Sequence, residues 1–423
     1  METPIFCNMW ERTAREAPPA CESLFGEIAC DVAVVGAGVT GLSAALRLRE
    51  GGADAVVLDA AFPAAGASGR SGGQIQPISG YGLARMLRGL SPDQADRVRA
   101  MALTSPDLVF DLIDRHSIDC DAVRTGLLRG IHHERLLPLP GHEPAADAGL
   151  EFLDREQTAR MVGSGMFHAS YFDCRGGGVN PCAYTRGLCR AARSAGVRVF
   201  SKSPALELRS DNSSWIVRTP QGTVKARNVV VATNAFSHGL VEALEQTIVT
   251  VNSIQIATYP LSGKLAASIL PGGQIASDTR RLVYYFRKDA EGRLVVGGRG
   301  PASDVGNFGH YGFLVAWMQK NFPFMAPPRI QYYWSGEVAI TADGLPHVHE
   351  PARGLHIVAG FNGKGMAMGT RLGTSTAERI LHDDPARYGF AVRGMRPYPF
   401  WRFRKAGVRL AVSAYRVLDK FGR

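Results

Sequence analysis

Three glycines and one acidic residue early in the chain have the spacing of a site for a nucleotide pyrophosphate. In such a site the first glycine permits a tight turn, the second lets backbone approach the pyrophosphate, and the third lets a helix pack close to a strand. Unpaired N–H groups at the start of that helix face the phosphate charge, and an acid after the next strand can accept hydrogen bonds from an adenosine ribose. We therefore predict an adenine dinucleotide site with these contacts: Gly36, Gly38, Val39, Thr40, Gly41, Asp59 and Ala60.

The elements that must position these residues follow the order strand, turn, helix, strand. Residues 32–35 are a short unbroken apolar run, as expected for a strand buried on both faces. Residues 42–48 give the helix an apolar side, and Gly51-Gly52 ends it. Residues 56–58 form the second strand. Because the glycines lie between a strand and a helix, this context favours a bound dinucleotide over a glycine-rich turn without a ligand.

A second glycine loop and a polar strand end also have the character of ligand contacts. The loop 66–74 is rich in glycine and short polar side chains, as expected for backbone that lies against a cofactor. Residues 229–234 form a buried strand that ends in Thr233-Asn234. Polar groups at the carboxyl end of such a strand point at whatever lies beyond the sheet.

The remaining pattern predicts mainly helix from 78 to 149 with a Pro- and Ala-rich loop at 136–149, helices at 184–195 and 366–381, and mainly strands between 197 and 232 and between 247 and 335. The prolines Pro92 and Pro106 are expected near helix starts. Residues 282–287 and 293–297 flank a turn, which predicts a hairpin in an antiparallel sheet unlike the first unit. We read this second sheet as the substrate-facing part of the chain.

Length and composition indicate two domains and no membrane span. The chain has 423 residues, 45% of them hydrophobic, which exceeds one ordinary core. It has no run of about 18 apolar residues, and its first 27 residues lack the apolar stretch of a secretory signal. Its seven scattered cysteines include no C-x-x-C, which favours free thiols in a cytoplasmic protein. His347 and His349 have no third ligand nearby, so no metal site is predicted.

The net charge of +10 belongs mainly to the C-terminus, where residues 393–423 contain nine Lys/Arg and one Asp. The rest of the chain is nearly neutral, so no nucleic-acid partner is expected. Apolar residues recur at helical spacing between 408 and 418, although Leu410 and Val417 fall outside that face. Two interpretations stay open. We favour a helix docked on the body with its basic residues solvated; the other is a helix on anionic lipid, as would suit delivery of electrons to a membrane quinone.

The chain resembles the FAD-dependent oxidoreductases of the D-amino-acid oxidase and glycine oxidase superfamily, and within it the gamma-glutamylputrescine oxidase branch. The resemblance covers almost the whole chain in family order. It is carried by Met9-Trp10-Glu11, residues 31–48, residues 66–74, Gly178 to Pro181, residues 229–236, Val296 to Arg299, residues 334–346, and Gly360 to Met366. Two positions differ from the family pattern. Ser71 replaces a usual Asn, and Asn362-Gly363-Lys364 replaces a frequent Ser-Gly-His, which argues against transferring the putrescine-derived substrate.

The resemblance implies an α/β fold, α+β overall, in which an antiparallel substrate domain is inserted into a split Rossmann-like FAD domain with a parallel sheet. We expect the FAD domain at 1–85, 155–240 and 335–385, the substrate domain at 86–154 and 241–334, and a basic helical tail at 386–423. FAD is implied as the cofactor. Its further contacts would be Ser68, Gly69, Arg70, Ser71, Gly72, Gly73, Gln74, Ala205, Thr233, Asn234, Gly336, Gly360, Asn362, Gly363, Lys364, Gly365 and Met366.

Three residues are predicted to be catalytic: Lys364, Tyr285 and Arg287. Reduced flavin carries negative charge near N1, and a cation or helix N-terminus there stabilises it. Lys364 immediately precedes the predicted helix 366–381; a solvated lysine is the alternative. Residues 284–287 and Arg299 are candidates for the substrate side, because aromatic rings pack on an aminium and Arg clamps a carboxylate. Ordinary strand packing is their alternative.

The implied reaction is oxidation of a C–N bond in a small amine or amino acid to an imine, by hydride transfer to flavin N5. The partners are that substrate and oxygen, which re-oxidises the flavin. Two alternatives stay open: a dehydrogenase that passes electrons to a quinone or another carrier, and a dinucleotide-binding sensor without turnover.

Overall fold

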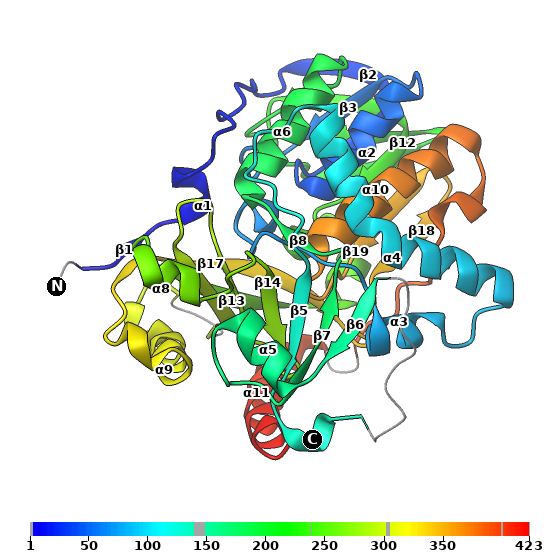
Figure 1. The fold of residues 1–423 in the computed structure, drawn as a ribbon. Coiled ribbons are helices and arrows are strands. Elements are labelled where there is room, and N and C mark those ends of the chain that lie inside the picture. Colours follow the sequence, from blue (N-terminus) through cyan, green and yellow to red (C-terminus); the bar gives the residue numbers. More distant parts are fainter. Residues whose placement is uncertain (1–2, 139–148, 238, 302–304, 399–400, 423) are drawn as a thin grey trace.

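Two large β-sheets organise the chain (Figure 1). The computed structural model describes residues 3–138, 149–237, 239–301, 305–398 and 401–422. One sheet is rich in parallel pairs and carries helices on its face, and the other is mostly antiparallel. The protein is therefore a mixed α/β structure, as the sequence predicted.

The first sheet has eight strands, and its centre is parallel. The order is β10-β11-β12-β2-β3-β9, and β19 pairs with β12 and with β18. The strands of this sheet are β2 (Gly26–Val35), β3 (Ala55–Leu58), β9 (Arg198–Phe200), β10 (Glu207–Asp211), β11 (Ser214–Arg218), β12 (Gly222–Val231), β18 (His347–Ala352) and β19 (Leu355–Ala359). Residues 32–35 and 55–58 are buried, as their unbroken apolar runs require for central strands covered on both faces.

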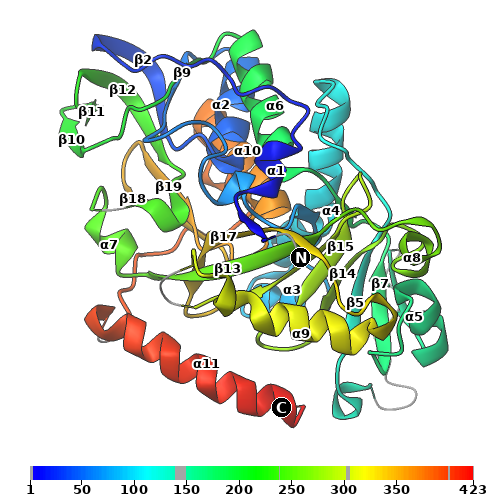
Figure 2. The same cartoon turned by 90° about the vertical axis from the view of Figure 1, so that its left-hand side faces the viewer.

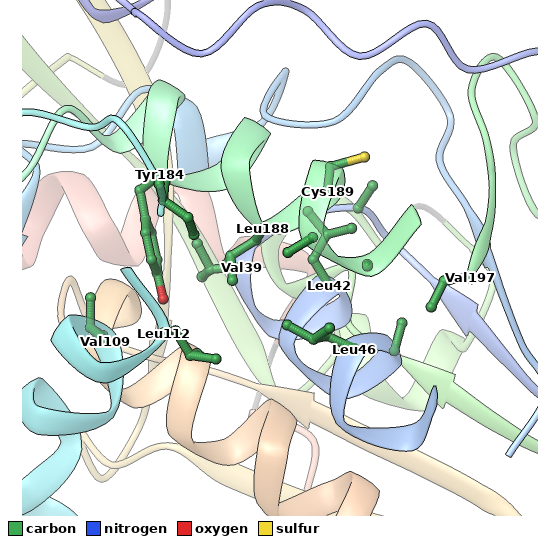
Figure 3. Packing of buried hydrophobic residues seen from close by; sticks show 14 of the residues in the cluster. Val39, Leu42, Leu46, Val109, Leu112, Tyr184, Leu188, Cys189 and Val197 are labelled. Carbon is green, nitrogen blue, oxygen red and sulfur yellow. The ribbon is translucent and has the colours of Figure 1, made fainter. Parts of the chain in front are cut away.

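Three helices pack together on one face of this sheet: α2 (Val39–Glu50), α6 (Pro181–Ser194) and α10 (Gly365–His382). Figure 3 shows Leu42 and Leu46 of α2 packed near Leu188 and Cys189 of α6. Helix α6 starts at Pro181, one turn before the predicted start. The reason is its cap, because the Asn180 carbonyl oxygen Oδ1 accepts the N–H groups of Cys182 and Ala183 at 3.1 and 3.0 Å.

The second sheet has nine strands in the order β1-β17-β13-β16-β15-β14-β5-β7-β6. They are β1 (Ile5–Phe6), β5 (Leu127–Ile131), β6 (Leu150–Leu153), β7 (Ala169–Asp173), β13 (Ile248–Thr258), β14 (Ile275–Asp278), β15 (Tyr285–Lys288), β16 (Leu294–Arg299) and β17 (Ile330–Thr341). The predicted hairpin is present as β15 and β16. Its outer face is covered by an apolar cluster that includes Leu314, Trp317 and Met318 of α9 (Gly312–Asn321).

The other elements are shorter or peripheral. The remaining helices are α1 (Met9–Arg12), α3 (Gly80–Leu87), α4 (Pro92–Arg115), α5 (Arg155–Val162), α7 (Glu242–Glu245), α8 (Gly263–Ser268) and α11 (Arg404–Lys420), and the two remaining strands, β4 (Gln74–Ile75) and β8 (Gly177–Gly178), pair with each other. In the part of the chain that the structure describes, no helix has the length and apolar character to cross a membrane.

The expectation of helical structure after residue 78 is wrong at residues 127–131, and the predicted loop at 136–149 lies mostly outside the described residues. Strand β5 follows Gly126 and lies between β14 and β7. Leu127, Leu128 and Ile131 are buried there. This short apolar run next to a glycine is a strand signal that the helical reading overlooked.

Pro106 lies inside α4 and does not mark a helix start. A proline has no N–H for the carbonyl four residues earlier, which here is that of Ala102. Ser105 Oγ at 3.1 Å and the backbone N–H of Ile78 at 3.2 Å donate to this carbonyl oxygen instead. Because other donors satisfy the carbonyl, the helix continues through the proline.

Sheet membership does not follow the predicted domain ranges everywhere. Strand β7 and the residues of β17 after 334 lie in the nine-stranded sheet, although the ranges 155–240 and 335–385 were expected in the FAD domain. Strand β17 is long and runs from one unit toward the other, so loop composition could not locate the transition. The two-domain division itself stays a prediction.

Candidate active site

A cavity of about 1480 Å³ lies between the two sheets. It is larger than an ordinary ligand pocket of roughly 300–1,000 Å³. On one side it is lined by Val35, Leu58 and Ala232, at the carboxyl ends of three parallel strands. On the other side it is lined by residues of the nine-stranded sheet. This position matches the rule that ligands bind beyond the carboxyl ends of parallel strands.

The turn after β2 has the geometry that its glycines predicted. Gly36 has a φ of +108°, and a Cβ at Gly41 would collide with the carbonyl oxygen of Gly36. Gly41 does not line the cavity and serves this packing instead. The Asp59 carboxylate accepts the N–H of Ala37 at 2.7 Å and that of Ala61 at 2.8 Å. Burial raises the pKa of Asp59, and these two N–H groups act against the rise.

Helix α2 directs its N-terminus into the cavity. Its N-cap residue, Gly38, has no side chain, and Val39 and Thr40 line the cavity. Ser68 Oγ accepts the N–H of Val39 at 3.1 Å and lies only 2.8 Å from where a Cβ on Gly38 would be. The helix start therefore presents backbone donors and a hydroxyl, which suits a phosphate group.

The loop 66–74 is held from several distant parts of the chain. The Arg70 carbonyl oxygen accepts Gln255 Nε2 at 2.7 Å and Trp334 Nε1 at 3.0 Å, and Arg70 Nε donates to the Ser335 carbonyl oxygen at 2.7 Å. Asn8 Nδ2 donates to the Gly69 carbonyl oxygen at 2.9 Å. These bonds fix the loop along the cavity between the two sheets.

Polar side chains form the floor of the cavity on the nine-stranded sheet. Strand register aligns Arg129, Ser277 and Tyr285 across β5, β14 and β15. Ser253 and Gln255 come from β13, and all five residues line the cavity. The intervening residues on these strands, among them Leu128, Ala276, Phe286 and Ile254, are buried in the opposite face. The sheet therefore separates a polar inner face from an apolar outer one.

Tyr285 lies flat on this floor. A Cβ at Gly297 or Gly72 would collide with its ring or press against it, so both glycines make room for the ring. The Tyr285 hydroxyl and Ser253 Oγ are 2.8 Å apart and share a hydrogen bond. Burial raises the pKa of Tyr285 far above neutral, so its hydroxyl stays protonated and cannot act as a base at ordinary pH.

Lys364 and Arg129 bring positive charge to one end of the floor. Lys364 is the N-cap residue of α10, whose first residues, Gly365 and Met366, also line the cavity. Burial and then the nearby Arg129 charge lower the pKa of Lys364 to about 7. Within the described residues, neither side chain makes an ion pair or a hydrogen bond. Two cations and a helix N-terminus thus face the same end of the cavity.

Arg287 does not lie where its guanidinium could bind the carboxylate of a substrate. It is buried, does not line the cavity, and donates from Nη1 to the Gly73 carbonyl oxygen at 2.9 Å. Its guanidinium lies 4.9 Å from the centre of the Trp10 ring. Burial lowers its pKa to about 10. Arg287 shares a strand face with Tyr285, but the loop around Gly73 covers it, so the predicted catalytic role does not fit this placement.

Two other substrate candidates, Tyr284 and Phe286, point away from the cavity. The Tyr284 ring stacks on Trp317 with centroids 5.2 Å apart, and Phe286 contacts the same tryptophan. Both belong to the outer face, as strand alternation requires once Tyr285 faces inward. Arg299, the remaining candidate, does line the cavity.

Most predicted cofactor contacts meet in this one cavity. The exceptions are Gly41, Gly69, Gly73 and Gly360, where an added Cβ would collide with neighbouring protein atoms. The predicted contacts that do line it are Gly36, Gly38, Val39, Thr40, Asp59, Ala60, Ser68, Arg70, Ser71, Gly72, Gln74, Ala205, Thr233, Asn234, Gly336, Asn362, Gly363, Lys364, Gly365 and Met366.

Sequence reasoning missed several residues of the floor. Ser253 and Gln255 are alternate polar residues in an apolar strand, and Arg129 is a lone charge within Leu127–Ile131. Such patterns indicate a strand with one polar face. Tyr415 of α11, which also lines the cavity, carries no local signal of this kind.

The cavity fits an anionic cofactor with a polar ring system. Its lining contains six basic and three acidic side chains: Arg70, Arg129, Arg280, Arg281, Arg299 and Lys364 against Asp59, Asp278 and Glu337. Asp278 pairs with Arg280. Gln255 Oε1 is buried and has no hydrogen-bond partner among the described residues. A pyrophosphate would suit the backbone donors at Gly38, and a ring N–H would suit the free Gln255 oxygen.

The sequence matches the family described as "FAD dependent oxidoreductase" (DAO) over residues 31–379. The chain therefore belongs to the DAO family of FAD-dependent oxidoreductases, and its cofactor is FAD. This confirms the resemblance inferred from the sequence.

Relatives in this family cover nearly the full chain. A "Probable oxidoreductase OrdL" of Haemophilus influenzae is 30% identical over 417 residues, 92% of each chain. The "Gamma-glutamylputrescine oxidoreductase" of Escherichia coli is 30% identical over 414 residues, 95% of each chain. The fold is similar to glycine oxidase from Geobacillus kaustophilus (TM-score 0.67, 20% identity, covering 86% of this chain and 99% of that one). It is also similar to L-proline dehydrogenase from P. horikoshii (TM-score 0.70, 18% identity, covering 85% and 95%).

Proposed function

We propose that this enzyme oxidises the C–N bond of a small amine or amino acid to an imine, and that oxygen re-oxidises its FAD. The observation that carries the proposal is the polar floor opposite the cofactor loops. The support is that Tyr285 and Arg129 of the floor line the same cavity as the loop 66–74, Lys364 and the first residues of α10. The gamma-glutamylputrescine oxidoreductase and glycine oxidase relatives support the amine or amino-acid class by their names.

The residues that would hold FAD divide along the cavity. Asp59, the turn at Gly36 and the start of α2 would hold the adenosine and pyrophosphate end. The loop 66–74, Gln255 and the loop 360–366 would hold the ring end. When bound, FAD supplies the acceptor for the hydride.

The chain's own residues then have positioning and charge roles. Arg129 and Arg299 lie on the floor and can attract a carboxylate. Tyr285 offers a flat, neutral ring on which an alkyl or aminium group can pack. Lys364, with a pKa of about 7, supplies a cation that is lost as the pH rises above neutral. None of these groups needs to be a strong base.

The substrate class is tested by anaerobic bleaching of the bound flavin with a panel of amines and amino acids. The proposal predicts bleaching by at least one member, with release of the corresponding imine hydrolysis product. If the flavin stays oxidised with every member, the protein fits a dinucleotide-binding sensor better than an enzyme of this substrate class.

A second candidate is a dehydrogenase that passes electrons to a quinone or another carrier. It is favoured by the rim of the cavity, where Leu136, Val283 and Tyr415 are 37%, 38% and 38% exposed and could admit an apolar acceptor. Hydrogen peroxide release, compared with and without an artificial acceptor, separates the two. An enzyme that reduces the acceptor but is silent with oxygen contradicts the oxidase assignment.

The adenosine assignment has its own test. Asp59→Ala should lower FAD retention after gel filtration, because it removes the acid beside the predicted ribose site. Unchanged flavin content would show that Asp59 only orders the turn through Ala37.

A further inference from the structure

Helix α11 is anchored to the body by its inner side. The Asp419 carboxylate accepts the N–H groups of Arg281 and Leu282 at 2.7 and 3.0 Å. The Asp419 carbonyl oxygen lies 3.2 Å from His132 Nε2, and Arg281 lies over the Tyr415 ring at 5.5 Å. Because these contacts fix the rotation of the helix about its axis, its outer side is also fixed.

The outer side carries a row of apolar side chains that are exposed to solvent. Phe403, Leu410 and Val417 are seven residues apart and are 71%, 74% and 56% exposed, and Phe421 is 53% exposed. A spacing of seven residues keeps Leu410 and Val417 on nearly the same side of α11, and Phe403 ends the short turn that leads into this helix. Leu410 and Val417 are the two residues that did not fit the inner apolar face in the sequence. They therefore belong to a second apolar face, and the favoured reading of a simply docked helix is incomplete.

A basic row runs beside the apolar one. Arg402, Arg409 and Arg416 each precede a member of the apolar row, and all three are exposed. Within the described residues these arginines form no ion pair. Asp419 is the single acidic residue between 393 and 423, and it is engaged on the inner side. The outer face of α11 is thus apolar and cationic without a compensating acid. Figure 2 shows that α11 lies along one edge of the molecule, outside the two sheets.

We propose that this outer face of α11 binds the surface of an anionic lipid bilayer. Parallel apolar and basic rows on one helix allow the apolar side chains to enter the acyl boundary while the arginines contact lipid phosphates. A second copy of the chain fits less well, since pairing of the two faces would bring their arginine rows together. A nucleic acid would leave Leu410 and Val417 against a charged backbone.

The bilayer would then lie across α11 from the cavity rim. Leu136, Val283 and Tyr415 line the cavity, and Tyr415 belongs to α11 itself. Because Tyr415 is on the inner side of α11, membrane contact through the outer side would leave one helix diameter, about 10–12 Å, between the rim and the lipid.

The test is co-sedimentation of the FAD-loaded full chain with vesicles of phosphatidylcholine alone or mixed with phosphatidylglycerol. We expect binding to the mixed vesicles only, weakened by salt. The variant Arg402→Gln/Arg409→Gln/Arg416→Gln should lower the partition coefficient at least about tenfold. The variant Leu410→Gln/Val417→Gln should lower it with the charge unchanged, because both rows take part.

The matched control removes the same charge elsewhere. Arg193, Arg209 and Arg353 are exposed residues on α6, on β10 and in the β18–β19 turn, away from α11 (Figure 2). The triple Arg→Gln variant at these positions should bind vesicles like the wild type. All variants are checked for flavin content and melting temperature, so that unfolding is not mistaken for lost binding.

Three results would overturn the proposal: no binding of the wild type to anionic vesicles at low salt, equal loss in the control variant, or equal binding by all variants. A dimer that depends on Leu410 and Val417, without vesicle binding, would assign the face to self-association. None of these outcomes bears on amine oxidation, which is measured on the enzyme in solution.

Discussion

The two ends of the cavity are built in different ways. The end at β2, α2 and β3 uses backbone groups from one short stretch, residues 31–59, with Asp59 bonded to the turn itself. The end at the nine-stranded sheet uses side chains from strands far apart in sequence, such as Arg129 and Tyr285. At the first end, few substitutions can be made without disturbing the backbone. At the second end, a single substitution can change one polar group and leave the others in place. This difference predicts how substitutions at the two ends should behave.

The largest effect is expected at the backbone end, from Gly41→Ala. The new Cβ would collide with the Gly36 carbonyl oxygen, and backbone cannot move aside as a flexible side chain does. We expect a loss of stability of about 1–3 kcal/mol or more and loss of most bound FAD. Thermal unfolding and visible absorbance of the purified protein measure both. The control is Gly312→Ala in α9, where a Cβ meets open space. If the two variants lost stability and FAD equally, the close backbone packing at Gly41 would not be the cause.

The next effect is expected at the side-chain end, from Lys364→Met. Removal of this cation should lower kcat/KM about 10²–10³-fold with little change in melting temperature. Because the pKa of Lys364 is lowered to about 7, its charge is present below pH 7 and is lost above it. The wild-type rate of flavin reduction should therefore fall as the pH rises through 7. Lys364→Arg should lack this fall, since arginine stays charged; an identical pH profile would exclude Lys364 as its source.

Arg287→Met tests whether a residue of the nine-stranded sheet acts by holding the backbone of the loop 66–74 and not by contacting the substrate. It removes a charged hydrogen bond to the Gly73 carbonyl oxygen and the contact with Trp10. We expect a loss of about 1.5–3 kcal/mol in denaturant unfolding and no specific rise in KM. A raised KM at unchanged stability would instead support the predicted role, in which Arg287 binds the substrate.

The smallest effect is expected from Tyr285→Phe, which keeps the ring and removes the hydrogen bond to Ser253. It should cost about 0.5–1.5 kcal/mol and leave activity within about tenfold of the wild type. The matched control is Tyr284→Phe on the outer face, which should change neither quantity. A loss of activity much larger than the loss of stability would show that the Tyr285 hydroxyl takes part in the reaction.

The same contrast explains what could be predicted from the sequence. The site from Gly36 to Asp59 was predicted because its parts are close in sequence and each glycine has one physical reason. The floor was predicted only in part, because the alignment of Arg129 with Tyr285 depends on strand register across β14. Arg287 shows a further limit. Strand alternation correctly gave its face, but alternation does not say that a loop from residues 66–74 would cover it.

The anchoring of the loop 66–74 has a consequence for biosynthesis. Its partners on Gln255 and Trp334 lie 185 and 264 residues after Arg70, and ordering of this kind requires closure of long stretches of chain. The loop cannot take its final form on a nascent chain until β17 has emerged from the ribosome. The turn at Gly36 packs on Ala232 and needs only strands up to β12, which emerge before β17, so the adenosine half of FAD could be captured before the half that reacts has a place to bind.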